Sequence, residues 1–257
     1  MKSQINGVDM TRPTILTIAG FDPSNGAGIG SDIKAMEQNN AYGLSVITAV
    51  TFQNESEFHG VRWLSFDEIK MQLDSLASKY KPKCIKIGLV ESVEVLSGIL
   101  DFINENWPEA YVIWDPILKA TAGFEFHNNI SNSIKNLLKK GIHLITPNIP
   151  EYKELFKELD PQSFVDQFNC SLLIKGGHST DTSVCDELYI PDEKPYFILS
   201  DKVEDNIQKH GTGCILSSVI ASNLANQLSL KEACREAHFY VKSFIASTSG
   251  LLGYHSK

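Results

Sequence analysis

The residues from Lys209 to Cys214 have the composition of an anion-binding turn. Gly211 and Gly213 flank Thr212, and Cys214 stands where a small, apolar, helix-forming run begins. The first N–H groups of a helix lack internal partners and the helix dipole is positive there, so a glycine turn before a helix favours phosphate. A thiol at such a place loses its proton more easily than in water. Taken alone, these residues fit equally well a glycine turn with a buried cysteine.

Three charged side chains at the ends of expected elements have types that suit phosphoryl transfer. Asp115 and Glu151 offer hard oxygen ligands for a Mg²⁺ ion that keeps several waters. Lys175 offers a compact cation for a phosphate oxygen. The alternatives are structural: a turn carboxylate for Asp115, a helix N-terminal charge for Glu151, and a solvated strand end for Lys175.

A polar ring is recognised by side chains that hydrogen-bond to it, and Asp22 and Gln53 are candidates for that role. Gln53 could equally close a strand, and Lys209 with His210 could form a surface charge pair. The absence of a Gly-x-x-x-x-Gly-Lys-Ser/Thr sequence argues against an ordinary P-loop enzyme. The glycine-containing loop at 20–30 is too long for a dinucleotide fingerprint and lacks its third glycine, which argues against a nicotinamide oxidoreductase.

Strands and helices alternate along almost the whole chain. This pattern predicts a three-layer αβα sandwich with a mostly parallel central sheet, in a single domain over 1–257 whose first 13 residues form a flexible terminus. The expected strands cover 14–19, 43–54, 83–89, 111–116, 142–148 and 171–178, with a short extended piece at 61–64 and an exposed hairpin at 184–190 and 196–199. The expected helices cover 31–39, 65–80, 92–106 and 130–140, one from 150 onward, and two after 212.

The carboxyl ends of the expected strands carry most of the candidate site residues. In an open parallel sheet the ligand lies beyond those ends, so these residues should meet at one edge. The residues concerned are Gly20, Asp22, Gln53, Gly88, Leu89, Asp115, Asn148, Glu151, Lys175 and Gly177.

Composition narrows the class of protein further. The 257 residues are 42% hydrophobic and 21% charged, and the net charge of −8 argues against a nucleic-acid surface. Five scattered cysteines without a C-x-x-C pair argue against zinc or redox motifs and favour reduced thiols. The first 13 residues lack the apolar core of a secretory signal and no stretch is long enough to span a membrane, so we expect a cytoplasmic protein without membrane partners.

Several motifs occur in an order that resembles one enzyme family. They are Ile18–Gly28, Gly43–Asn54, Lys86–Gly88, Asp115–Pro116, Thr146–Glu151, Lys175–His178 and His210–Cys214. The chain resembles the hydroxymethylpyrimidine/phosphomethylpyrimidine kinases of thiamine biosynthesis, in the ribokinase-like superfamily, from about residue 14 to about residue 245. The motifs at the two ends are the most specific, whereas Asn148-x-x-Glu151 is shared across the superfamily.

The resemblance implies a reaction and a role for each matching residue. Members phosphorylate 4-amino-5-hydroxymethyl-2-methylpyrimidine and then its monophosphate with ATP and Mg²⁺, and relatives suggest a homodimer. Cys214 stands where sugar kinases of the superfamily carry an aspartate base, so it is the expected acceptor of the hydroxyl proton. The other implied roles are anion hole for Gly211, Thr212 and Gly213, pyrimidine contact for Gly20, Gln53 and Leu89, nucleotide contact for Lys175 and Thr212, and magnesium environment for Asp115 and Glu151. Asp22 and Cys214 complete the expected substrate site, and Gly177 and Gly213 the ATP site.

Two other functions stay open at this point. A pyridoxal or pyridoxine kinase of the same superfamily is the nearest alternative, because some relatives with the Gly-Thr-Gly-Cys turn accept the pyridine ring and Cys214 could attack an aldehyde. A pyrimidine- or nucleotide-binding regulator without activity is the more distant one, since fold alone does not fix function.

Overall fold

The apolar runs of the sequence form one nine-stranded sheet in the part of the chain that the structure, a computed structural model, describes: residues 12–117, 136–157, 159–176, 183–203 and 209–256. The strand order is β3-β2-β1-β4-β5-β6-β7-β8-β9. The six strands from β2 to β7 in this order are parallel, while β3, β8 and β9 are antiparallel to their neighbours. The predicted mostly parallel sheet is therefore confirmed.

The bounds of the elements are as follows. The strands are β1 Thr14–Phe21, β2 Tyr42–Gln53, β3 Phe58–Trp63, β4 Cys84–Ile87, β5 Tyr111–Trp114, β6 Leu144–Ile145, β7 Ser171–Ile174, β8 Ser183–Tyr189 and β9 Tyr196–Asp201. The helices are α1 Gly28–Gln38, α2 Phe66–Ala77, α3 Val93–Asn106, α5 Ile149–Phe156, α6 Pro161–Phe168, α7 Thr212–Ala225 and α8 Leu230–Ala246.

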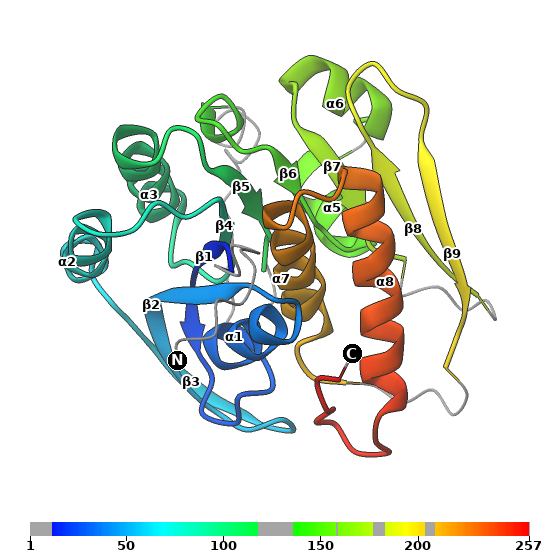
Figure 1. Cartoon of the computed structure of the whole chain (residues 1–257), viewed down its shortest axis with the longest axis horizontal. Coiled ribbons are helices and arrows are strands. Elements are labelled where there is room, and N and C mark those ends of the chain that lie inside the picture. The colour runs from blue at the N-terminus through cyan, green and yellow to red at the C-terminus, as the bar shows by residue number, and fades with distance from the viewer. Residues whose placement is uncertain (1–11, 118–135, 158, 177–182, 204–208, 257) are drawn as a thin grey trace, which may run out of the picture.

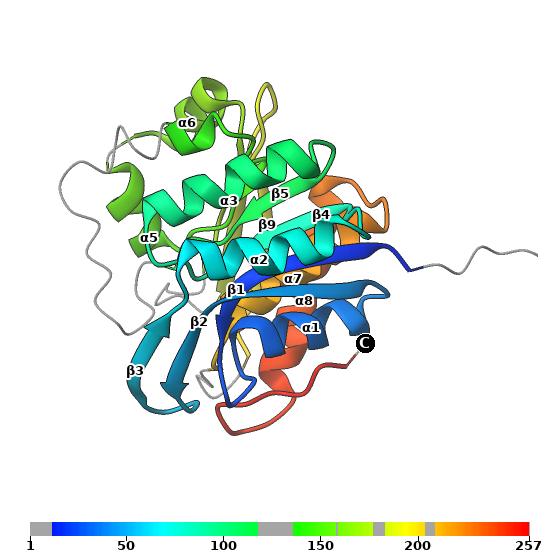
Figure 2. The same ribbon diagram turned by 90° about the vertical axis from the view of Figure 1, so that its left-hand side faces the viewer.

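Helices cover both faces of the sheet, which completes the predicted sandwich (Figures 1 and 2). One apolar core lies under α2, α3, α5 and α6, and the other lies under α1, α7 and α8. The strands between them carry fully buried residues, as expected for parallel strands covered on both sides. In the described part of the chain, no helix combines the length and apolar character that crossing a bilayer needs.

Local sequence signals set most helix starts. The Ser65–Glu68 and Ser229–Glu232 pairs form reciprocal capping boxes at α2 and α8, as the sequence predicts. Helix α1 begins at Gly28, three residues before the predicted start. Helix α6 is not among the predicted elements, although Asp160 caps it and Pro161 opens it. The predicted helix at 130–140 lies outside the described residues up to 135.

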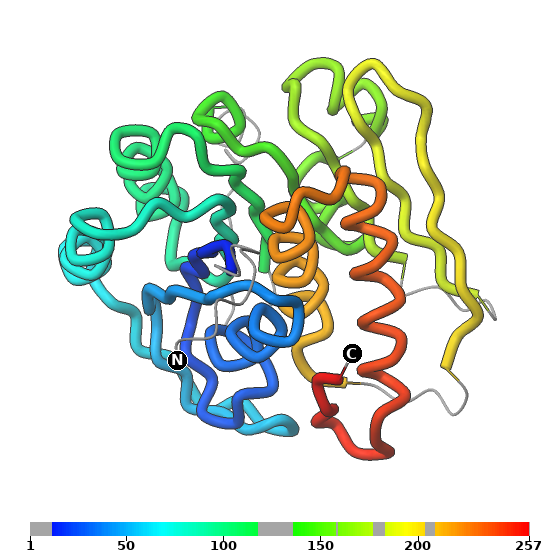
Figure 3. Tube along the Cα trace, in the orientation of Figure 1, coloured from blue at the N-terminus to red at the C-terminus, as the bar shows by residue number. Residues whose placement is uncertain are grey.

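Two features of the sheet shape the edge where the candidate residues lie. Strand β2 runs past the end of β1, and its last residues pair with β3 alone, so the β2–β3 pair projects beyond the sheet (Figure 2). After α8 the chain folds back toward the start of α7 (Figure 3), where the His210 N–H donates to the Leu251 carbonyl.

Candidate active site

A cavity of about 750 Å³ opens at the carboxyl edge of the parallel strands. The predicted shared edge is thus observed, although the role of each residue stays a prediction. The candidates that line the cavity are Gly20, Asp22, Gln53, Leu89, Asp115, Glu151, Lys175, Gly211, Thr212, Gly213 and Cys214. Gly177 lies outside the described residues.

The glycine turn before α7 faces the charged side of this cavity. Gly211 is the N-cap of α7 with φ +80°, a left-handed conformation that glycine adopts without strain. A Cβ atom at Gly213 would lie 3.2 Å from Lys175 Nζ and 3.8 Å from the Asp115 carboxylate. The free N–H groups at the start of α7 therefore open toward a buried cation and a carboxylate, as an anion site requires.

Asp115 and Lys175 form a buried ion pair at the ends of β5 and β7. Lys175 Nζ donates to Asp115 Oδ1 over 2.9 Å, and the Thr146 and Ser217 hydroxyls donate to the same carboxylate over 3.0 and 3.2 Å. Burial raises the pKa of Asp115, but the charges of Lys175 and Lys86 outweigh it, so the pKa lies below its ordinary value. The carboxylate is therefore charged, and its hydrogen bonds hold it in one position. An exposed turn carboxylate would have no such fixed position.

Glu151 has two roles in the structure. It forms a capping box with Asn148 at the start of α5, and its Oε2 accepts the Asn148 N–H over 2.7 Å. The same oxygen lies 3.9 Å from Lys175 Nζ, so the ammonium bridges two carboxylates. Burial raises the pKa of Glu151 despite the opposing effect of Lys175. Glu151 is thus a charge at the N-terminus of a helix, as the structural alternative predicts. Its side chain also lines the cavity.

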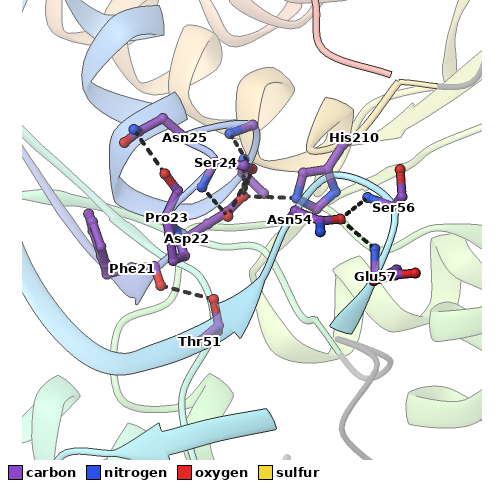
Figure 4. A network of polar contacts seen from close by, with 12 residues as sticks. Phe21, Asp22, Pro23, Ser24, Asn25, Thr51, Asn54, Ser56, Glu57 and His210 are labelled. Carbon is purple, nitrogen blue, oxygen red and sulfur yellow. Dashed lines mark hydrogen bonds and ion pairs between the residues drawn. The ribbon is translucent and has the colours of Figure 1, made fainter. Parts of the chain in front are cut away.

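Asp22 organises two loops of the protein rather than offering a free carboxylate to a ligand. Its oxygens accept from the Ser24 N–H and hydroxyl, the Ala27 N–H and His210 Nε2, over 2.9–3.0 Å (Figure 4). Burial raises the pKa of Asp22, but hydrogen bonds from Ser24, His210 and Ala27 outweigh it and lower the pKa. The carboxylate joins the loop after β1 to the turn before α7.

The suggestion that Lys209 and His210 form a surface charge pair is wrong. His210 contacts Asp22, which is 188 positions away in the sequence. Lys209 is buried and donates to the Thr248 hydroxyl and to the Thr248 and Gly250 carbonyls. These contacts anchor the chain just before Gly211.

Cys214 lies in the first turn of α7 at the bottom of the cavity. Burial dominates and raises the pKa of the Cys214 thiol to about 11, against the lowering effects of Lys86 and of the Gly28 N–H. The structure therefore differs from the expectation of an easily ionised thiol, because desolvation of the thiolate exceeds the help from the helix start.

Sequence reasoning missed a chain of polar contacts that supports the turn after β7. The Gly176 N–H donates to Asp186 Oδ1 over 2.9 Å, and the other Asp186 oxygen lies 2.7 Å from His238 Nδ1. His238 Nε2 contacts the Ser200 hydroxyl over 2.8 Å. Asp186, Ser200 and His238 lie on β8, β9 and α8, which are far apart in the sequence, so no spacing rule connects them. The sequence indicates only that polar residues occur within apolar segments.

The projecting β2–β3 pair closes the far side of the cavity with polar groups. Gln53 and Glu57 line it, and Asn54 Oδ1 accepts the Ser56 and Glu57 N–H groups over 2.8 Å (Figure 4). Gly20 and Leu89 also line the cavity, where a Cβ atom at Gly20 would lie 2.9 Å from Leu89. The cavity therefore has an apolar wall, an amide wall and an anion turn, which is the chemistry of a site for a small polar ring next to a phosphate.

A mostly parallel sheet with an anion turn at the start of a helix, set across a small-molecule cavity from a buried carboxylate–lysine pair, defines a ribokinase-like kinase, a phosphotransferase. A family model described as phosphomethylpyrimidine kinase matches residues 22–256. The chain belongs to the phosphomethylpyrimidine kinase family.

Individual relatives agree with this assignment. The chain is 29% identical over 251 residues to a hydroxymethylpyrimidine/phosphomethylpyrimidine kinase of Staphylococcus aureus, covering 93% of this chain and 90% of the relative. The crystal structure of phosphomethylpyrimidine kinase from Clostridium difficile is similar with a TM-score of 0.72 and 28% identity, over 90% of this chain and 98% of that one. A Staphylococcus aureus pyridoxal kinase in complex with AMP-PCP is similar with a TM-score of 0.78 and 25% identity, over 91% and 88% of the two chains.

Proposed function

We propose that the protein phosphorylates the hydroxymethyl group of 4-amino-5-hydroxymethyl-2-methylpyrimidine, and then the resulting monophosphate, with ATP as donor, in thiamine diphosphate biosynthesis. The observation that carries this proposal is the anion turn of α7 facing Lys175 and Asp115 inside a cavity walled by Gln53 and Leu89. Membership of the phosphomethylpyrimidine kinase family supports it independently.

The position of each residue in the cavity suggests its role in the reaction. In this proposal Gly20, Leu89 and the Gln53 amide, which line the same cavity, contact the pyrimidine. The N–H groups of Gly211, Thr212 and Gly213 stabilise the charge that develops on the transferred phosphoryl group. Lys175 is close enough to the turn to neutralise the same phosphoryl oxygens.

Cys214 is the proposed acceptor of the substrate's hydroxyl proton. As the new O–P bond forms and the O–P bond to ADP breaks, the proton passes from the hydroxyl oxygen to the sulfur of the ionised Cys214, which becomes a neutral thiol. Asp22 has a positioning role in this proposal, because its carboxylate is occupied by Ser24, Ala27 and His210.

The residues present fit a magnesium ion that is bound chiefly through nucleotide phosphates. Asp115 and Glu151 are hard oxygen donors at the same ammonium, and Mg²⁺ in such sites uses one or two protein carboxylates with waters and phosphate oxygens. Among the described residues, no group of three His, Cys, Asp or Glu side chains could hold a metal by itself. When bound with the nucleotide, the ion supplies charge neutralisation for the phosphates.

The second candidate function is a pyridoxal kinase. It is favoured by the likeness to the pyridoxal kinase of Staphylococcus aureus and by Cys214, which faces the cavity where it could add to an aldehyde. A pyrimidine-binding regulator without activity is less favoured, because each position that the reaction needs is filled. The homodimer and the cytoplasmic location that the resemblance implies stay predictions.

The test is ADP release with the pyrimidine alcohol, its monophosphate and pyridoxal, each in turn. We expect turnover with the two pyrimidines, and turnover of pyridoxal alone would overturn the proposal. Cys214→Ala should lose turnover far more than binding of the pyrimidine alcohol, since it removes the proposed proton acceptor and leaves Gly20, Gln53 and Leu89 in place. Cys185→Ala, in β8 and away from the cavity, is the matched control and should keep the wild-type rate.

A further inference from the structure

A fully buried ion pair lies below the cavity and is not used by the mechanism given above. Lys86 Nζ in β4 donates to Asp32 Oδ2 in α1 over 2.8 Å, and both side chains are 0% exposed. Thr17 and Ser218 also donate to the Asp32 carboxylate, over 2.6 and 2.8 Å. A buried ion pair is weak evidence for stability, because apolar side chains of similar volume often serve as well. The pair therefore raises the question of what else it does.

The pair and Cys214 share one interface between α1, α7 and β4. Ser218, which contacts Asp32, lies four residues after Cys214 in α7, and side chains at this spacing lie on the same face of a helix. The thiol is thus one helical turn from the ion pair along α7.

The Lys86 ammonium is joined through Asp32 to Ser218, one helical turn of α7 from the thiol. Among the described residues it makes one hydrogen bond, to Asp32, although an ammonium has three donors. A Cβ atom at Gly88 would lie 3.0 Å from Lys86 Nζ, which places the ammonium just under the strand end beside the Leu89 wall. A positive charge at this depth acts on Cys214 with little screening, because solvent is excluded.

Four charged groups act on the Cys214 sulfur from the elements packed around it. Lys86 from β4 and Lys175 after β7 favour the thiolate, whereas Asp32 from α1 and Asp115 after β5 oppose it. Burial is the largest effect and raises the pKa of the thiol, and Lys86 is the strongest of the charges that lower it. Asp32 acts in the opposite sense and more weakly than Lys86.

We propose that Lys86 is a positioning residue for phosphoryl transfer: its ammonium stabilises the Cys214 thiolate through space, and Asp32 holds the ammonium in place and moderates its effect. This inference rests on the proposed function only in assigning the proton acceptor role to Cys214. The electrostatic relation between Lys86, Asp32 and the thiol does not depend on which alcohol is the substrate.

The test measures the thiol directly. Iodoacetamide alkylation of the intact protein is followed from pH 6 to 11, and the Cys214 peptide is quantified by mass spectrometry so that other cysteines do not contribute. Lys86→Met removes the cation, and we expect the midpoint of the pH profile to rise by about 1–3 units. The wild-type pKa is about 11, so where a midpoint lies above the measured range its shift is obtained from the alkylation rate at a fixed lower pH. Since nucleophilicity increases with pKa, the rate at a fixed pH below the midpoint falls by only about 3- to 30-fold.

Asp32→Asn supplies the opposite change. It keeps an oxygen acceptor for Lys86 and removes the charge that opposes the thiolate, so the midpoint should fall and alkylation should accelerate. Ser218→Ala is the matched control, because it removes a hydrogen bond to Asp32 one turn from Cys214 and leaves both charges, so the midpoint should stay within about 0.3 units of wild type.

The signs of these changes decide the question. A purely structural pair would loosen the same interface in both variants and shift the two midpoints in the same direction, or leave both unchanged, and either result overturns the proposal. If Lys86→Met does not fold, as judged by tryptophan fluorescence, Asp32→Asn decides alone, and a midpoint that is not lowered overturns the proposal. Opposite shifts in a protein that phosphorylates no pyrimidine would support the electrostatic relation and refute the proposed function separately.

Discussion

Gly211 is the position where a single added carbon should damage both the fold and the anion turn. Its φ of +80° is a left-handed conformation, and a Cβ atom there would lie 2.0 Å from the Gly26 carbonyl oxygen and 2.9 Å from Ala27 Cα. These contacts are backbone atoms of the loop that Asp22 holds in place, so they cannot move aside as a flexible side chain would. Gly211→Ala should therefore push the loop after β1 away from the start of α7.

The magnitude follows from two costs. The left-handed conformation costs a residue with a Cβ about 1–2 kcal/mol, and overpacking of a tight contact costs about 1–3 kcal/mol. We expect a loss of about 2–5 kcal/mol in the free energy of unfolding, a large part of the total for a typical domain. A displaced N–H donor lowers catalysis by about 10²- to 10³-fold, so turnover should fall by at least that factor.

Urea unfolding followed by the fluorescence of the buried Trp107 and Trp114 measures the first effect, and ADP release measures the second. Gly250→Ala is the control, because a Cβ atom there meets nothing within 4 Å. A Gly211→Ala protein within about 0.5 kcal/mol and twofold of wild type would refute the argument that the two loops are locked together at this point.

Two further predictions concern the carboxylates. Asp22→Asn should lower the free energy of unfolding at pH 7 by about 1–3 kcal/mol, because the ionised group accepts several hydrogen bonds. Since the folded-state pKa of Asp22 lies below the ordinary value of 3.8, its contribution is present above that pH and is lost as the pH falls through the folded pKa. The difference between wild type and variant in urea unfolding should thus close toward pH 2, and a gap that stays constant down to that pH would contradict this. Asp115→Asn should raise the magnesium concentration needed for half-maximal turnover, because it removes one of the two carboxylates beside Lys175; a magnesium titration that matches wild type would reassign Asp115 to structure alone.

The architecture was predictable because its signals are local and repeated. Apolar β-branched runs that alternate with helical patterns predict a parallel sheet covered on both faces, and parallel strands bring their carboxyl ends to one edge. That argument predicts the meeting of Gly20, Asp115 and Lys175 without any knowledge of their contacts. Reciprocal capping at Ser65 and Ser229 was predictable for the same reason, since both partners lie three residues apart.

Contacts between distant residues could not be predicted in this way. His210 and Asp22 are 188 positions apart, and Lys86 and Asp32 are 54 apart, so no spacing rule connects them. The sequence around Lys86 indicates only a strand, and in a sheet covered on both faces every side chain of such a strand is buried. Which charge is buried opposite it depends on how α1 packs against β4, and that is a property of the assembled sandwich.

Cys214 shows how the two kinds of information combine. Its place after a glycine turn predicts a readily ionised thiol, because a helix start favours negative charge. The folded chain buries the sulfur, and desolvation reverses the sign of the shift, raising the pKa to about 11. A thiol with that pKa is protonated near neutral pH, so it accepts the hydroxyl proton only after a nearby positive charge has stabilised the thiolate. The buried Lys86 is held by Asp32, so we expect further changes in charge near the thiol to come from ligands that enter the cavity, and the proton transfer to depend on their binding.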